Sequence, residues 1–225
     1  IAGVEEILLS FPPSNKEVTD LMLASCHIGG VTEAVSIGGA QAIAAMAFGT
    51  ESIKKVDKIF GPGNKYVAEA KRQVYGIVGI DSITGPSEVM IIADESANPE
   101  FIAADLLAQA EHGMDSSCFL VLIKKGIKEN INEALQSQLS SLARSEIAKK
   151  SLNDFSFAIE VDNLKEAERV CNVVHPEHLQ ISLDNLDNVT KENFSAGAIF
   201  IGSSNSAVFG DYCAGPSHVI PTNGA

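Results

Sequence analysis

Short apolar segments alternate with amphipathic or alanine-rich segments along most of the chain, and this alternation constrains the fold more than any other feature. Strand-like segments occupy residues 4–9, 33–37, 56–60, 77–81, 89–93, 118–123, 155–161, 179–182 and 198–201. Helix-like segments lie between them, at residues 15–25, 40–48, 65–74, 99–111, 127–152 and 164–174. Strands that alternate with helices usually pair in parallel, so we expect an α/β protein with mainly parallel sheets. Residues 202–225 are rich in Gly, Ser and Pro and are expected to form a loop.

The length of the chain allows one large domain or two small ones. Its 225 residues are enough for a substantial buried core. The Gly85-Pro86 turn, which separates two strand-like segments, is the favoured boundary. We therefore expect two domains, residues 1–86 and 87–225.

The charge balance excludes several classes of partner. The chain has 16 basic and 29 acidic side chains, a formal net charge of −13. This charge repels a phosphate backbone and an anionic membrane surface, so neither nucleic acid nor a membrane is an expected partner. The longest apolar stretches, such as residues 42–48, are far shorter than a membrane span. No signal peptide is recognisable, although Ile1 is not a natural initiator and leaves a missing N-terminal segment open.

The four cysteines are scattered and show no CxxC spacing, which favours free thiols in a reducing cytoplasm. They are Cys26, Cys118, Cys171 and Cys213. Cys118 and Cys171 fall in apolar periodic segments, so we expect buried small side chains there rather than nucleophiles.

Two short segments carry candidate metal or acid–base groups. Gln109 and His112 are three residues apart at the end of a predicted helix, where both side chains can face one divalent metal ion. A polar helix end, with His112 interacting with the helix dipole, is the alternative. In His175-Pro176-Glu177-His178, the proline ends a helix and leaves Glu177 and His178 in a turn before a strand. There they can transfer protons, or they can simply be solvated.

Three glycine-containing loops are further candidates. Residues 210–218 place Asp211, Tyr212 and His218 in one loop, where a carboxylate can bind a cation. Residues 61–64 and 38–41 each follow a strand and open a helix, a setting that suits a bound phosphate. Neither matches GxGxxG or a Walker motif, and turns without any ligand use the same residues.

In combination, these segments resemble histidinol dehydrogenases. The resemblance follows the family's order and covers almost the whole chain, through GGAQAIAAMAFGT (38–50), KIFGPGNKYVAEAKRQV (58–74), GPSEV (85–89), DLLAQAEHG (105–113), HPEHL (175–179), SAGAIFIG (195–202) and GDYCAGPSHVIPT (210–222). It implies two incomplete Rossmann-like domains in an intertwined homodimer. It also implies a zinc- and NAD-dependent enzyme that oxidises L-histidinol through the aldehyde to L-histidine, with two NAD, at the end of histidine biosynthesis.

The resemblance also implies roles for individual residues. His178 matches the general base, and Glu177 its partner that activates water. The matching zinc ligands are Gln109, His112 and Asp211, and zinc would mainly orient the substrate. The first domain would bind NAD and the second zinc and substrate. Matching NAD contacts are Gln41 and Asn64, and matching substrate contacts are Ser87, Gln109, His112, His178 and Asp211, with Tyr212 and His218 as further candidates.

The chain departs from the family pattern at its ends. The family extends further on both sides and supplies there an NAD-binding tyrosine, a fourth zinc ligand (a histidine) and a substrate-binding glutamate, the last two across the dimer. Ser217 stands where the family commonly has Asn. We therefore expect little or no activity from these 225 residues alone. A metal-dependent hydrolase or lyase and a non-catalytic metabolite-binding paralogue are the rival interpretations.

Overall fold

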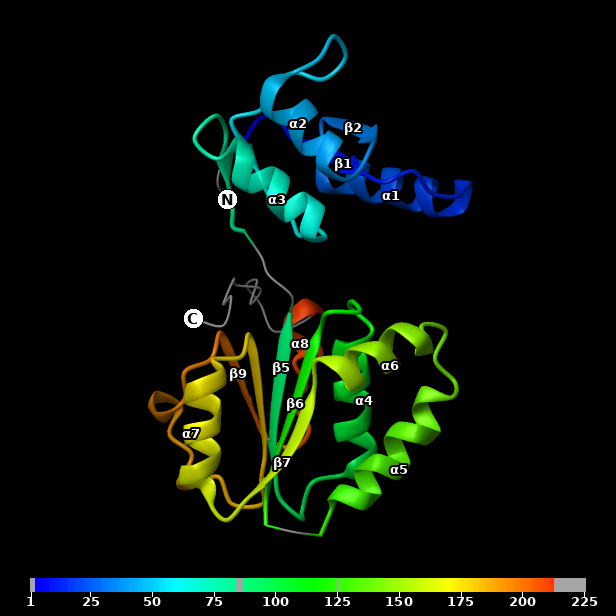
Figure 1. The fold of residues 1–225 in the computed structure, drawn as a ribbon. Helices are drawn as coiled ribbons and strands as arrows, with labels where there is room; N and C mark the ends of the chain where they lie inside the picture. The colour runs from blue at the N-terminus through cyan, green and yellow to red at the C-terminus, as the bar shows by residue number, and fades with distance from the viewer. Residues whose placement is uncertain (1–2, 84–86, 125, 213–225) are drawn as a thin grey trace. The chain divides into compact units, whose positions relative to one another are not determined.

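The chain forms two compact units, residues 1–83 and 84–225 (Figure 1). The computed structural model describes residues 3–83, 87–124 and 126–212, without the side chains of Asp211 and Tyr212. The predicted boundary turn at Gly85-Pro86, as well as Cys213, Ser217 and His218, lies outside the described residues.

Unit 1 contains two separate pairs of parallel strands. Strand β1 (Leu8–Phe11) pairs with β2 (Glu33–Ser36), and β3 (Lys58–Ile59) pairs with β4 (Gly79–Ile80). Its helices are α1 (Lys16–Gly29), α2 (Ala40–Phe48) and α3 (Lys65–Val74). The core joins α2 and α3 through Ile43, Met46, Val74 and their neighbours.

Asparagine side chains fix where two of these helices begin. Asn15 Oδ1 accepts a hydrogen bond from the Val18 amide at 2.9 Å, and Asn64 Oδ1 accepts from Tyr66 at 3.0 Å. Each bond satisfies an amide that has no partner within the first helical turn, so both residues act as N-caps.

A buried ion pair anchors the loop that precedes α3. Lys71 Nζ donates to Asp81 Oδ1 at 2.6 Å and to the Gly61 carbonyl, and only 4% of its side chain is exposed. Asp81 Oδ2 accepts from the Gly61 amide at 2.8 Å, so both peptide groups of Gly61 are held. Gly61 has φ +123°, a conformation that L side chains rarely adopt. This ring of hydrogen bonds sets the conformation of the loop.

The Asp81 carboxyl is tuned by opposing effects. Burial raises its pKa, but hydrogen bonds from Lys71, Gly61 and Ser82 together outweigh burial and lower the pKa below 3.8. Because the pKa of Asp81 is lower in the folded state, its carboxylate stabilises unit 1 at pH values above the ordinary pKa of an aspartate. This contribution is lost as the pH falls through the lowered pKa.

Unit 2 is built on one five-stranded parallel sheet with the order β7-β6-β5-β8-β9. The strands are β5 (Glu88–Ala93), β6 (Ser117–Ile123), β7 (Phe157–Val161), β8 (His178–Ser182) and β9 (Ala198–Ile201). All described strand pairs in both units are parallel, which confirms the α/β prediction.

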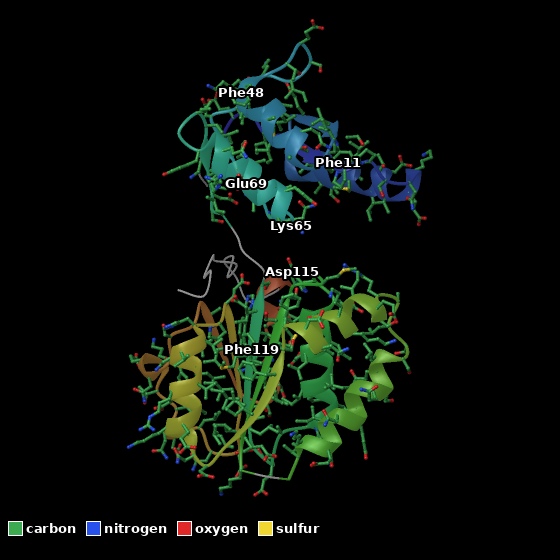
Figure 2. The ribbon with its side chains drawn as sticks, in the orientation of Figure 1. Phe11, Phe48, Lys65, Glu69, Asp115 and Phe119 are labelled. Atoms are coloured by element: carbon green, nitrogen blue, oxygen red, sulfur yellow. The ribbon has the colours of Figure 1, made fainter. Side chains whose placement is uncertain are left out.

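Helices cover both faces of this sheet (Figure 1). Helix α4 (Pro99–Ala110) packs on one face together with α5 (Lys128–Leu139) and α6 (Ser145–Asp154). Helix α7 (Leu164–Val174) packs on the other face, which Phe119 also lines (Figure 2). The central strand β5 is buried on both sides because it contributes to both cores, which explains its continuous apolar sequence.

Three sequence-based predictions about elements were wrong. The single helix expected at 127–152 is two helices, since α5 ends near Ser140 and Ser141, whose hydroxyls bond carbonyls three residues back. The strand expected to be buried at 4–9 is β1, shifted to Leu8–Phe11, and Phe11 is its buried residue (Figure 2). The expected C-terminal loop contains helix α8 (Val208–Tyr212).

Among the described residues, no helix is long and apolar enough to cross a membrane.

We expect Lys71→Met to destabilise unit 1 by about 3 kcal/mol, because the substitution leaves the partly buried Asp81 carboxylate without its cation. Hydrogen exchange of the α3 amides, measured against denaturant concentration, reports the stability of this unit separately from unit 2.

Arg72→Met is the matched control, since Arg72 is the next residue but forms an exposed pair with Glu69. It should change the exchange rates little. Equal effects of the two substitutions would show that the ring at Gly61 does not stabilise the unit.

Candidate functional site

Polar groups gather where β5 and β8 begin. Ser87 precedes β5, and Glu177 precedes β8, whose first residue is His178. The two strands pair in parallel with Val89 opposite His178, so segments about 90 residues apart meet at the amino edge of the sheet. Helix α4 connects two parallel strands and runs back toward this edge, where it brings Gln109. Ligands in open α/β sheets usually bind at the carboxyl edge instead.

Glu177 is the centre of a short hydrogen-bonded network. Its Oε2 accepts a hydrogen bond from Ser87 Oγ at 2.6 Å, and its backbone amide donates to Glu88 Oε2 at 3.3 Å. His178 Nδ1 lies 4.0 Å from Glu177 Oε2, and both residues are more than 90% buried. The expected turn is therefore compact enough to bring these adjacent side chains together, although His178 itself belongs to the strand.

His112 lies just beyond the end of α4, where the sequence predicted the last helical turn. Its Nδ1 lies 2.9 Å from the Ala108 carbonyl, which can only accept a hydrogen bond. In the neutral ring Nδ1 therefore carries the proton and Nε2 the lone pair. A lone pair on Nε2 is what a metal ion requires.

Gln109 is buried, with 7% exposure, and its Nε2 has no hydrogen-bond partner among the described residues. Buried amides are normally satisfied, so this one indicates a partner outside the described residues.

Other predicted site residues are placed less completely. Asp211 belongs to α8, but its side chain and that of Tyr212 are not described. Among the described side chains, no three His, Cys, Asp or Glu residues form a group that could hold a metal. Gln41 lies in the first turn of α2 in unit 1, and Asn64 caps α3 there.

Sequence reasoning missed a polar stripe on β8. His178, Gln180 and Ser182 are all buried on the face that packs against α4, whereas Leu179 and Ile181 face α7. Gln180 Nε2 donates to Asp105 Oδ2 at 2.7 Å. The alternation in HLQIS was the available signal, because a strand buried on both faces is normally apolar throughout.

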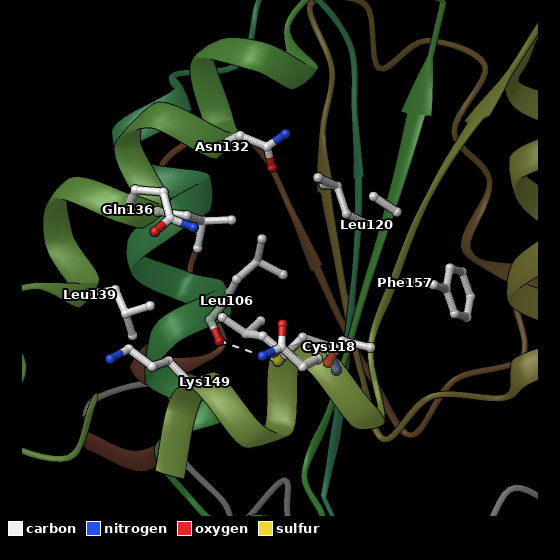
Figure 3. Close-up of a pocket in the computed structure, with 13 residues that line it drawn as sticks. Leu106, Cys118, Leu120, Asn132, Gln136, Leu139, Lys149 and Phe157 are labelled. Carbon is white, nitrogen blue, oxygen red and sulfur yellow. Dashed lines mark hydrogen bonds between the residues drawn. The ribbon is translucent and has the colours of Figure 1, made fainter. Parts of the chain in front are cut away.

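Cys118 and Cys171 are buried, as predicted. Burial raises their pKa values to about 12 and about 11. Cys118 forms part of the wall of a cavity of about 450 Å³ beside α5 and α6 (Figure 3). None of the candidate site residues is among the described residues that line this cavity.

Comparison with known proteins decides the family. The family model for histidinol dehydrogenase matches residues 1–225. The chain belongs to the histidinol dehydrogenase family. A histidinol dehydrogenase from Listeria monocytogenes is 47% identical over 224 residues, and one from Caldanaerobacter subterraneus is 48% identical. Each alignment covers 100% of this chain and 52% of the relative.

A solved structure supports the same conclusion. The crystal structure of histidinol dehydrogenase from Elizabethkingia anophelis matches with a TM-score of 0.90 and 42% identity, over 99% of this chain and 52% of that chain. The incomplete Rossmann-like architecture expected from the sequence is consistent with this match. The chain thus spans about half the length of the histidinol dehydrogenases that it matches.

We expect His112 to be the Nδ1–H tautomer when neutral, because the Ala108 carbonyl holds that proton. Long-range ¹H–¹⁵N correlation spectra at mildly alkaline pH distinguish the tautomers. His175 is the internal comparison, since its Nδ1 contacts the Ser195 hydroxyl, which can donate or accept. Observation of His112 as the Nε2–H tautomer would contradict the prediction.

Proposed function

We propose that this chain is part of an enzyme that oxidises L-histidinol through L-histidinaldehyde to L-histidine, with two NAD consumed. The observation that carries the proposal is the contact of half-buried Ser87 with buried Glu177, next to buried His178, in a chain that the family model for histidinol dehydrogenase matches over all its residues. Such an enzyme needs one group that takes a hydroxyl proton and another that activates water. His178 and Glu177 supply them side by side.

The first oxidation requires a base at the substrate hydroxyl. His178 takes this proton while the carbon gives up its hydride, which leaves the aldehyde. The imidazole becomes cationic in this step, and the Glu177 carboxylate 4.0 Å away favours the charged form.

The second oxidation requires water. Glu177 removes a proton from water as the water oxygen bonds to the aldehyde carbon, and the carbonyl oxygen takes up a proton to complete the hydrate. The hydrate then loses a second hydride, to the second NAD, and two protons to give the carboxylate. The hydrogen bond from Ser87 orients the Glu177 carboxylate for this step. We also assign Ser87, Gln109, His112, His178 and Asp211 to substrate binding.

The residues present fit a zinc ion. His112 offers Nε2, Gln109 is a buried amide without a described partner, and Asp211 would supply a carboxylate. When bound, zinc would mainly orient the substrate in the site.

Residues 1–86 are the proposed NAD-binding domain, and residues 87–225 are the proposed zinc- and substrate-binding domain. The Gly61 loop, fixed by Lys71 and Asp81, leads into the first turn of α3, whose amides attract phosphate. Because Asn64 Oδ1 is used in capping, contact with NAD would fall to its Nδ2, and Gln41 would provide a second contact. NAD would supply the hydride acceptor. We further propose a cytoplasmic homodimer.

In a full-length form, Glu177→Gln should slow aldehyde oxidation by about 10²- to 10⁴-fold and slow alcohol oxidation less, because only the aldehyde step needs activated water. Steady-state NADH formation from histidinaldehyde measures the second step, and the NADH formed in the first turnover of histidinol measures the first. Glu146→Gln, at an exposed position on α6, is the control and should alter neither rate. Equal losses in both steps would refute this division of roles.

The 225 residues alone should form little or no NADH from histidinol, whereas a polypeptide of the relatives' length should form it readily. The expected tyrosine, histidine and glutamate of the family would lie in the flanking segments. Substantial histidinol-dependent NADH from the short chain would overturn this prediction. A hydrolase or lyase would give no NADH from either form.

A further inference from the structure

One carboxylate joins three elements that carry candidate site residues. Asp105 lies on α4, one helical turn before Gln109. Its Oδ2 accepts from Gln180 Nε2 on β8 at 2.7 Å, and its Oδ1 accepts from Ser206 Oγ at 2.6 Å. Gln180 is 95% buried, so its amide depends on this partner.

The bond to Gln180 sets the register between α4 and β8. His178 is two residues from Gln180, on the same face and toward the amino edge, a rise of about 6.6 Å along the strand. Gln109 is four residues from Asp105 in the same direction, a rise of about 6 Å along the helix. The two distances match, so the bond between Asp105 and Gln180 holds Gln109 level with His178.

The bond to Ser206 sets the position of α8. Ser206 Oγ also accepts a hydrogen bond from the Val208 amide, at 3.3 Å, and so holds the start of this helix. Figure 1 shows α8 at the end of the sheet where β5 begins. The segment that carries Asp211 is thus tied to the helix that carries Gln109 and precedes His112.

We propose that Asp105 is a positioning residue that aligns the zinc-binding side chains with His178. This inference rests on the proposed function. Asp105 acts through Gln180 and Ser206 and is not itself assigned a contact with substrate or metal.

The test compares Asp105→Ala with Asp105→Asn in the full-length protein. Removal of both hydrogen bonds should weaken zinc affinity about 10- to 100-fold and lower kcat to a similar degree. Asn retains an acceptor and a donor for the two partners, so this variant should stay within about threefold of the unchanged protein. Competition with a chelator measures zinc affinity. Hydrogen exchange at residues 205–212 measures the local stability of the segment that contains α8.

Asp94 provides the matched control. It is half-buried like Asp105 and accepts hydrogen bonds from Ser96 and from the Asp184 amide, but it lies just beyond the carboxyl end of β5. Asp94→Ala should lower the melting temperature without a specific loss of zinc affinity or kcat. Zinc affinity and kcat that are unchanged in Asp105→Ala, or lowered equally in Asp94→Ala, would overturn the proposal.

Two further comparisons keep the inference testable. If Asp105→Ala does not fold, Ser206→Ala removes only the bond to the α8 segment. It should weaken zinc affinity and speed exchange at residues 205–212, and unchanged values would count against the proposal. Failure of the unchanged protein to form NADH from histidinol would contradict the proposed function but not the proposed role of Asp105. Zinc affinity and exchange in the variants would still decide the role of Asp105.

Discussion

The parallel pairing of β5 with β8 is the interaction on which unit 2 depends. β5 is buried on both faces, and its register with β8 determines which residues stand together at the amino edge. A shift of one residue would turn His178 and Gln180 away from α4 and place Leu179 against it. The apolar side chains of β5 therefore hold the register on which the bond between Ser87 and Glu177 depends.

The fold was largely predictable because its determinants are local. Asn15 and Asn64 mark helix starts, Pro12-Pro13 ends β1, and the apolar run of β5 identifies a central strand. The division of 127–152 was harder to predict, because Ser140 and Ser141 end α5 through hydroxyl bonds that helix-interior serines can also form. Whether such serines end a helix or lie within it depends on how the two helices pack against α4.

The site was predictable only in part. Glu177 and His178 could be predicted to act together, because they are adjacent, and the family resemblance suggested Ser87. No local pattern assigns the Ser87 hydroxyl to Glu177, or Asp105 to both Gln180 and Ser206, since these partners are 75 to 101 residues apart. In unit 1, the local sequence likewise does not distinguish Lys71 from an exposed helical lysine. Its burial follows from its contacts with Asp81 and Gly61, which only the structure shows.

The position of the group at the amino edge has a consequence for sequence variation. The loops at the carboxyl edge, including residues 94–98 and 183–185, are separated from Glu177 and His178 by the length of the strands, about 17 to 20 Å for strands of five or six residues. In most α/β proteins those loops hold the ligand and tolerate little change. Under the proposed function, substitutions in these loops are expected to alter the chemistry less than substitutions at the amino edge.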